Sequence, residues 1–303
     1  MTMPSKLERL FTVYSADLER YAPRFKGHFG CPLCYRVLQR ATPLQDIVAE
    51  EHIVPEQLGG RLVTLTCRRC NNEQGSELDA HLIRRVRAET GRYRLPARVR
   101  IGKGEFGAQV HLPRSESDLL DIMRIPRQSD PQKLAAAHQE LLTGQHEIHF
   151  TLNFGYNHMR SLAGLVRVAY LLMFRCFGYR YVLDVSGKSV NRQIQNPFDH
   201  TGVFNGIIWR LQEPIPSELS MPVVTVVSRP AEFQCFMVML RLDAESNHYA
   251  AVTLPPPGED GYQMYARLQS PEASGQRTVT AIETSRRGFL PLWELWEHFT
   301  NIT

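Results

Sequence analysis

Four cysteines in two closely spaced pairs are the clearest chemical signal in the sequence. Cys31 and Cys34 form one Cys-x-x-Cys pair, Cys67 and Cys70 form the other, and 32 residues separate the two pairs. Four thiolates complete a tetrahedral shell around zinc, and a two-residue spacing lets each pair supply two ligands from one turn. A closed shell leaves no open coordination position, so we expect structural Zn²⁺ and look for chemistry between the two pairs.

A carboxylate beside a histidine lies in that interval. Glu51 and His52 are adjacent, and Asn71 and Asn72 directly follow the last cysteine. Carboxylate and carboxamide oxygens suit a hard cation such as Mg²⁺ or Mn²⁺, and an imidazole with an unperturbed pKa of about 6.5 can activate water. This set of residues suits hydrolysis of a phosphodiester, although a histidine taken alone is more often structural.

Together these motifs resemble the zinc-stabilised HNH endonucleases of the ββα-metal type, over about residues 28–89. The resemblance rests on Cys-x-x-Cys, Glu51-His52-Ile53-Val54-Pro55, Leu58-Gly59-Gly60 and Cys-x-x-Cys-Asn71-Asn72. It implies that His52 is the general base and that Glu51 and Asn71 hold one divalent metal, with Asn72 as the candidate if Asn71 points away. It also implies products with 5′-phosphate and 3′-hydroxyl ends.

Two positions depart from the pattern of that family. The loop before the second strand reads Gly60-Arg61-Leu62 and lacks the asparagine that commonly orients the histidine, and Glu51 replaces the commoner aspartate. The strand itself raises a geometric problem, because neighbouring side chains of a regular strand face opposite ways. We therefore expect the strand to end or bulge at Glu51 and His52 so that both can reach one phosphate.

Apolar spacing and turn residues predict the elements that position these groups. In the N-terminal part we expect a helix over residues 5–21, strands over 47–52 and 62–66, and a helix from Arg69 to about Thr90. Glycines and a proline among arginines predict a basic connector over residues 91–107, which contains the domain boundary.

The second half predicts a mixed domain. Helices are expected over residues 131–142, 157–176 and 290–299, and strands over 223–227, 235–240, 249–254 and 278–282. The longest apolar run, residues 162–174, is interrupted by Arg167 and predicts a buried core helix, in which Cys176, like Cys235 elsewhere, is an inert core thiol. The fold class is α+β, with a zinc-stabilised ββα-metal module within residues 1–104 and a mixed α+β domain over residues 105–303 for target recognition, oligomerisation or sensing.

A cluster of basic residues predicts the partner. Residues 81–103 hold eight basic residues and one acid, Glu89. Such a cluster attracts a polyanion, and we expect contacts with the phosphates of double-stranded DNA, against the competing interpretation of a merely solvated face. The cluster comprises Arg84, Arg85, Arg87, Arg92, Arg94, Arg98, Arg100 and Lys103. From Arg92 to Arg100 the arginines alternate with other residues, which indicates an extended segment with one basic side.

The function favoured by these observations is a metal-dependent endonuclease that acts on DNA. The mixed charges of the first twenty residues and the sparse cysteines favour a cytoplasmic protein without a membrane segment. Two alternatives stay open. One is a non-cleaving zinc module that binds nucleic acid, and the other is a nuclease gated by a ligand of residues 105–303, as in bacterial or phage defence.

Overall fold

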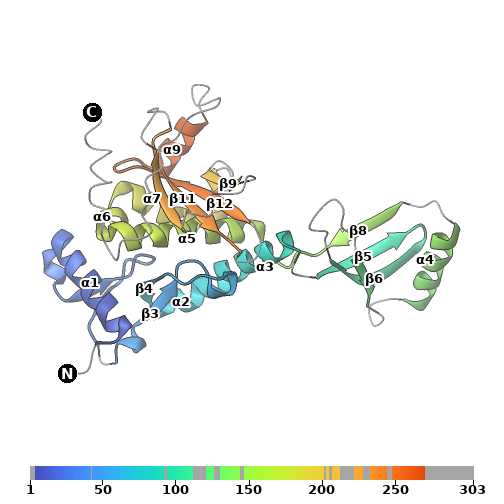
Figure 1. The fold of residues 1–303 in the computed structure, drawn as a ribbon, viewed down its shortest axis with the longest axis horizontal. Helices are drawn as coiled ribbons and strands as arrows, with labels where there is room; N and C mark the ends of the chain where they lie inside the picture. The colour runs from blue at the N-terminus through green and yellow to red at the C-terminus, as the bar shows by residue number, and fades with distance from the viewer. Residues whose placement is uncertain are drawn as a thin grey trace. The chain divides into compact units, whose positions relative to one another are not determined.

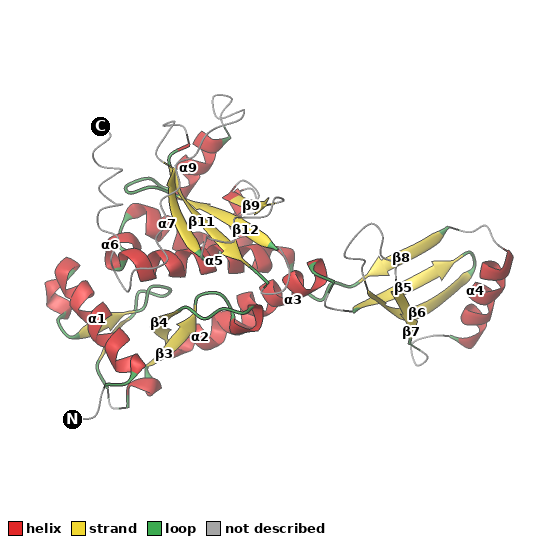
Figure 2. Cartoon of the chain, viewed as in Figure 1, coloured by secondary structure: helices red, strands yellow, loops and turns green. Residues whose placement is uncertain are grey.

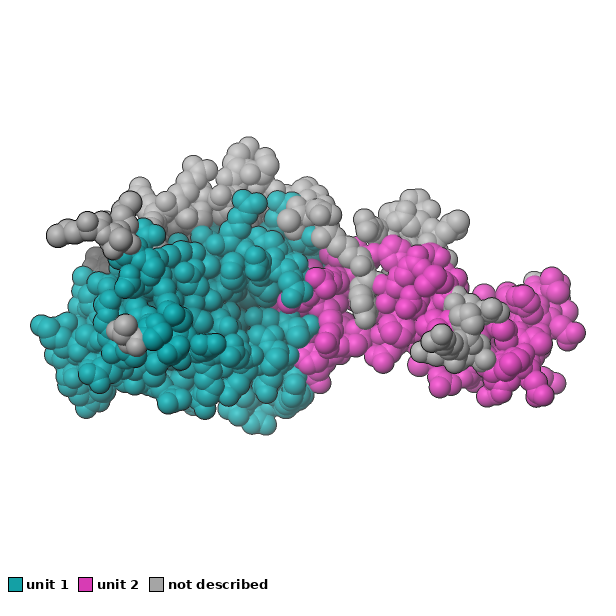
Figure 3. Space-filling view, turned by 90° about the horizontal axis from the view of Figure 1, so that it is seen from below, with its two compact units in different colours: residues 1–80, 159–303 teal, residues 81–158 magenta. Residues whose placement is uncertain are grey.

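The computed structural model divides into two compact units. Unit 1 comprises residues 1–80 and 159–303, and unit 2 comprises residues 81–158 (Figure 3). The structure describes residues 4–41, 43–91, 94–111, 121–125, 130–143, 147–200, 203–204, 207–211, 222–227, 233–243 and 248–269. Arg92, the predicted strand 278–282 and the predicted helix 290–299 lie outside these ranges. The expected boundary near residue 104 falls inside unit 2, so the two units differ from the predicted division into 1–104 and 105–303.

Unit 1 begins with a helix and two hairpins. Helix α1 (Lys6–Tyr21) is started by a capping box between Ser5 and Glu8. Strand β1 (His28–Gly30) pairs with β2 (Val37–Gln39), and β3 (Val48–His52) pairs with β4 (Val63–Cys67), both antiparallel. Helix α2 (Arg68–Gln74) follows β4 directly, which confirms the predicted order of strand, strand and helix.

The helix predicted from Arg69 to Thr90 is interrupted. A π-helical turn, Gly75–Asp79, separates α2 from α3 (Ala80–Glu89). Such a turn widens the hydrogen-bonded ring and rotates the following side chains around the helix axis, and it is often found at functional sites. A Cβ built on Gly75 would meet no atom within 4 Å. A lack of space for a side chain therefore does not explain why this residue is glycine.

The C-terminal part of unit 1 combines helices with a sheet (Figures 1 and 2). Helices α5 (His158–Phe177), α6 (Tyr179–Val182), α7 (Val185–Gln195) and α9 (Gly261–Leu268) accompany a sheet in the order β10 (Val223–Val227), β11 (Cys235–Arg241), β12 (Tyr249–Leu254), β9 (Ile208–Leu211). Phe236 of β11 packs against Phe177 and Tyr181, with ring centroids 5.2 and 6.3 Å apart. Every residue from Ser161 to Phe174 is buried, which confirms α5 as a core helix.

Side chains from these later helices hold the first cysteine pair in place. The Tyr170 hydroxyl of α5 donates to the Pro32 carbonyl at 2.8 Å. The Asn191 amide of α7 donates to the carbonyls of Pro32 and Leu33 at 3.1 Å, and the Gln195 amide donates to Leu33 at 3.0 Å. The turn between Cys31 and Cys34 therefore depends on residues from the C-terminal segment.

Unit 2 is a four-stranded antiparallel sheet with a helix. Its strand order is β7 (Asp121–Arg124), β6 (Gly104–His111), β5 (Leu95–Ile101), β8 (Ile148–Leu152), and α4 (Pro131–Thr143) packs mainly on β6. Val99, Ile101, Ala108 and Ala137 form its core. None of the described helices in either unit is long and apolar enough to cross a bilayer.

The prediction of a basic connector over residues 91–107 is therefore wrong. Gly102 has a φ of 53° in the tight turn between β5 and β6, a conformation that glycine adopts easily. A Cβ on Gly104 would lie 2.1 Å from the Ala137 nitrogen, so this glycine lets α4 approach the sheet. The predicted alternation is confirmed, because β5 buries every second residue from Leu95 and exposes Arg98 and Arg100.

A fragment of residues 1–104 tests the dependence of the zinc module on the later helices. We expect it to unfold without a cooperative transition and to hold less than one zinc per chain, because the donors to Pro32 and Leu33 are missing. Circular dichroism during heating and zinc analysis, with the full chain as control, measure both properties. A fragment with stoichiometric zinc and a sharp transition would show that the module folds alone.

Candidate active site and zinc centre

All four predicted zinc ligands converge. The sulfur atoms of Cys31, Cys34, Cys67 and Cys70 lie within 4.8 Å of one another, and the Sγ atoms of Cys34 and Cys67 are 3.7 Å apart. Sulfurs placed at about 2.3 Å from a central zinc form a tetrahedron with edges of about 3.8 Å. The cluster thus has the size and the ligands of a structural zinc site.

Main-chain groups hold these sulfurs in position. The Cys67 amide donates to Cys31 Sγ at 3.3 Å, and the Cys70 amide donates to Cys67 Sγ at 3.4 Å. Cys67 ends β4 and caps α2, so the second pair sits at one strand-to-helix junction. Hydrogen bonding among the sulfurs lowers the pKa of the Cys34 and Cys67 thiols, whereas burial raises the pKa of Cys31. Zinc binds the thiolate form.

The other two cysteines lie outside this cluster. Cys176 and Cys235 are both buried, and burial raises the pKa of each thiol to about 12. A protonated thiol is a poor nucleophile. These values agree with the prediction of inert core thiols.

His52 is half-buried at the end of β3, next to the loop that leads to β4. Its Nδ1 lies 3.2 Å from the main-chain carbonyl oxygen of Gly60. A carbonyl oxygen only accepts hydrogen bonds, so in the neutral imidazole this contact places the proton on Nδ1 and leaves the lone pair on Nε2. In the HNH family an asparagine side chain of this loop commonly orients the histidine. Here the main-chain carbonyl of Gly60 contacts His52 instead.

The two glycines of this loop make that contact possible. Gly59 has a φ of 85°, in the left-handed region. A Cβ on Gly60 would lie 1.8 Å from the Val54 carbonyl oxygen, so a side chain there would push the loop away. The Leu58-Gly59-Gly60 motif therefore has a steric reason in this structure.

The strand geometry at Glu51 and His52 differs in part from our expectation. Strand β3 ends at His52, as expected, yet its pairing stays regular through both residues, with Glu51 opposite Thr64 and His52 opposite Val63. No bulge interrupts the described hairpin. Alternation then sends the two side chains to opposite faces, so the expected convergence of both on one side is not reached.

Glu51 and Asn71 do meet. The Asn71 amide nitrogen donates to Glu51 Oε2 at 2.8 Å and to the Glu50 carbonyl at 3.3 Å. Thr66 Oγ1 donates to the same Glu51 oxygen at 3.4 Å. Glu51 is only 4% exposed, whereas Asn71 is half-buried. Asn72 is exposed on α2.

The other oxygen of Glu51 faces a cation that the sequence analysis did not assign to the site. Arg167 of α5 is fully buried, and its Nη2 lies 2.9 Å from Glu51 Oε1. Its Nη1 donates to both oxygens of Asp79 at 2.9 and 3.1 Å, and its Nε donates to Gln74 Oε1 at 2.9 Å. The sequence carried one signal for this residue, the charge that interrupts an apolar run.

Two buried carboxylates lie against a single buried guanidinium group. Two acids, Glu51 and Asp79, share Arg167, which leaves one negative charge in excess among these three side chains. Burial raises the pKa of Asp79 to about 6, against the lowering effect of Arg167, and the charge of Glu51 adds to the rise. An uncompensated buried charge is costly, so this cluster favours a further cation or a proton.

This balance fits the divalent metal that the HNH resemblance implies. Glu51 Oε2 and the Asn71 side chain are in contact, and both residue types offer oxygen ligands to a hard cation. Rotation of the Asn71 amide places its oxygen where the nitrogen now lies. Two protein ligands with open positions suit Mg²⁺, which usually keeps several waters.

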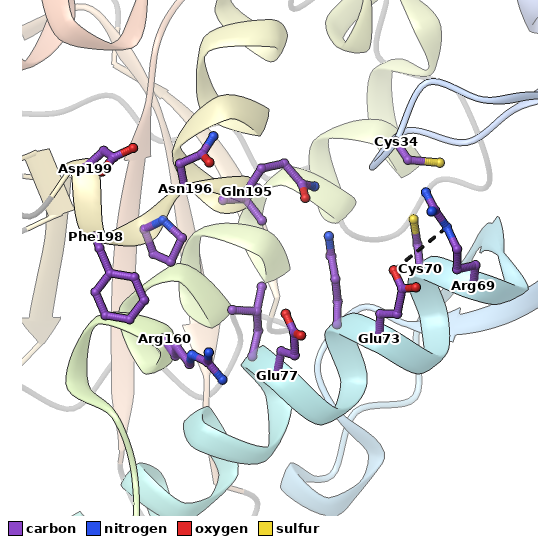
Figure 4. Close-up of a pocket in the computed structure, with 14 residues that line it drawn as sticks. Cys34, Arg69, Cys70, Glu73, Glu77, Arg160, Gln195, Asn196, Phe198 and Asp199 are labelled. Carbon is purple, nitrogen blue, oxygen red and sulfur yellow. Dashed lines mark ion pairs between the residues drawn. The ribbon is translucent and has the colours of Figure 1, made fainter.

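Two cavities of unit 1 lie near these groups. One, of about 310 Å³, adjoins the zinc cysteines and is lined by Arg69 and Arg160 together with Glu73, Glu77 and Asp199 (Figure 4). Arg69 pairs with Glu73 at 3.8 Å, and the formal charge of the described lining is −1. The other, of about 290 Å³, adjoins the loop that contacts His52.

The predicted DNA-contacting residues that the structure describes all belong to unit 2. Three of them have acidic partners, Arg85 with Glu89 at 2.9 Å, Arg94 with Asp121 at 3.2 Å and Arg98 with Glu105 at 2.7 Å. Arg84 donates to the Gly155 carbonyl. Arg100 is exposed on β5, Lys103 is exposed at the β5–β6 turn, and Arg87 is half-buried on α3. Because Glu105 and Asp121 lie outside residues 81–103, the net positive charge around these arginines is smaller than the count over residues 81–103 indicates.

A comparison with protein families finds a match in the same part of the chain. Residues 33–87 match the family model for HNH endonucleases. This range contains Glu51, His52, Asn71 and three of the zinc cysteines, so the HNH resemblance is confirmed for this segment. No curated protein and no solved structure matches the chain.

Arg167→Met tests how much the buried ion network contributes to the stability of the fold. We expect a loss of about 3–5 kcal/mol in the free energy of unfolding, because Glu51 and Asp79 lose their counterion while still buried. Urea denaturation of the variant and the wild type measures it. Arg192→Met, an exposed arginine on α7, is the matched control and should change stability by less than about 0.5 kcal/mol. Equal small effects of both variants would contradict the assigned role.

Proposed function

We propose that the HNH module hydrolyses phosphodiester bonds of DNA. In this proposal His52 activates the attacking water, and Glu51 and Asn71 hold one Mg²⁺ or Mn²⁺. The observation that carries the proposal is the contact between His52 Nδ1 and the Gly60 carbonyl, within the segment that matches HNH endonucleases. It supports a histidine whose Nε2 is ready to accept a proton.

The proposed reaction uses the protein groups as follows. Nε2 of His52 takes a proton from water, the water oxygen forms a bond to phosphorus, and the bond from phosphorus to the 3′ oxygen breaks. The products are a 5′-phosphate and a 3′-hydroxyl, which takes its proton from solvent. Arg167 holds Oε1 of Glu51, and Oε2 contacts Asn71. A divalent cation, when bound, stabilises negative charge on the phosphoryl and leaving oxygens.

His52→Ala tests the proposed base. We expect loss of plasmid cleavage by about 100-fold or more in Mg²⁺ or Mn²⁺, with DNA binding, melting temperature and zinc content unchanged. His28→Ala is a matched control, because His28 is also half-buried and its Nδ1 also contacts a carbonyl, that of Lys26 at 2.8 Å. Cleavage retained by His52→Ala, or lost equally in both variants, would refute this role.

A non-cleaving zinc module that binds nucleic acid is the second candidate. It is favoured by the regular pairing of β3, which directs Glu51 and His52 to opposite faces, and by the ion pair of Glu51 with Arg167. The same plasmid assay separates the two functions. Wild-type protein that contains zinc and binds DNA, yet leaves plasmid intact with either metal, supports the second candidate.

The DNA contact is proposed for unit 2, where Arg100 and Lys103 are exposed on β5 and at the turn that follows it. We expect Arg100→Glu together with Lys103→Glu to weaken DNA binding and to flatten its salt dependence, by about 0.9 in the slope of log K against log salt for each phosphate that the protein no longer neutralises. Fluorescence anisotropy at several salt concentrations measures the slope. Lys188→Glu on α7 of unit 1 is the control, and an unchanged slope in the double variant would remove these residues from the interface.

A further inference from the structure

The cavity beside the His52 loop is lined by two arginines to which the proposed functions assign no role. Its volume is about 290 Å³, and its wall includes Gly59, Gly60 and Arg61 from the loop, together with Arg241 from the end of β11. The remaining described lining is apolar, contributed by residues such as Leu58 and Leu62. A cavity with two guanidinium groups and an apolar wall suits an anion that carries carbon atoms.

The charge of this cavity distinguishes it from the cavity beside the zinc. Both charged residues of its described lining are arginines, whereas acids outnumber arginines in the lining of the zinc-side cavity (Figure 4). An anion is therefore favoured beside the His52 loop and disfavoured beside the zinc. The guanidinium group suits phosphate in particular, because its planar fork donates two parallel hydrogen bonds to two phosphate oxygens.

The cavity is tied to the proposed base through one residue. Gly60 lines the cavity, and its carbonyl oxygen accepts from His52 Nδ1 at 3.2 Å. Val54 also lines the cavity, and it lies two residues after His52 in the chain. A group bound in the cavity would thus lie next to the loop that orients the histidine.

Arg241 is held in place by the sheet. It pairs with Tyr249 at the end of β11, and its Nε donates to the Asp243 carbonyl at 3.0 Å. Arg61 is exposed on the loop directly after Gly60. One arginine thus comes from the HNH segment and the other from the C-terminal sheet, which places two distant parts of the sequence at one cavity.

We propose that Arg61 and Arg241 bind a phosphate of the nucleic-acid backbone beside the phosphate attacked by the water that His52 activates. The apolar wall faces the sugar carbons, and the two guanidinium groups bind the phosphate oxygens. Unit 1 then carries a backbone contact of its own, independent of the arginines of unit 2. This inference rests on the proposed nucleic-acid function and adds a substrate contact to it.

The test measures how DNA binding depends on salt in the single variants Arg61→Gln and Arg241→Gln and in the double variant, all in the non-cleaving His52→Ala background. We expect the double variant to lower the slope of log K against log salt by about 0.9, the value for one phosphate, and each single variant to lower it by a part of that amount. Arg192→Gln, an exposed arginine of unit 1 outside the cavity lining, is the matched control and keeps the slope. Melting temperature and zinc content verify the fold of each variant.

Unchanged slopes in Arg61→Gln and in the double variant would overturn the inference. So would a rise in melting temperature with inorganic phosphate that the double variant loses while its DNA slope stays unchanged, because the cavity would then bind free phosphate and not the polymer. The proposed hydrolysis is judged separately by plasmid cleavage of the wild type. Cleavage with unchanged slopes refutes only the cavity contact, and altered slopes without cleavage refute only the hydrolysis.

Discussion

One buried guanidinium connects the parts of the candidate site. Arg167 lies in the middle of a helix that is otherwise packed as core, and it contacts Glu51 of the hairpin and Asp79 of the π-helical turn. Charges taken out of water are tolerated only when they are paired and hydrogen-bonded. The hairpin, the π-helical turn and α5 must therefore keep their relative positions for this network to exist. The position of Glu51, a candidate metal ligand, depends on this requirement.

The four-cysteine cluster imposes a second constraint on the same region. Cys67 and Cys70 fix the junction of β4 and α2, and Asn71 follows directly. The side chains of α5 and α7 fix the carbonyls of the opposite cysteine turn. The candidate site is thus held by the four-cysteine cluster on one side and by side chains of α5 and α7 on the other.

Local patterns in the sequence predicted the elements of this region well. The cysteine spacing, the two strands and the start of α2 depend on residues close together in the chain, and the matching family segment covers the same residues. Arg167 was visible as an interruption of an apolar run, but its partners could not be predicted, because pairing over a long sequence separation depends on the tertiary fold. The contact between His52 and the Gly60 carbonyl could not be predicted either, because every residue has a main-chain carbonyl and the sequence does not mark which one makes a contact. The glycines of residues 91–107 resembled a linker, although their use is a tight turn and the close approach of a helix.

The ends of unit 2 have a consequence for how the chain assembles. The main-chain N–H of Asn157 donates to His81 Nδ1 at 2.9 Å, so the two ends of this inserted unit are joined to each other. Gln74 and Arg167 are 93 residues apart, and bringing two such distant points together costs chain entropy that grows with the length of the loop. Once residues 81–158 have folded, their joined ends form a short connection between Gln74 and Arg167 in place of a long flexible loop. During synthesis the segment with the four cysteines leaves the ribosome before Arg167 does, so Glu51 gains its arginine partner only after residues 81–158 have been made.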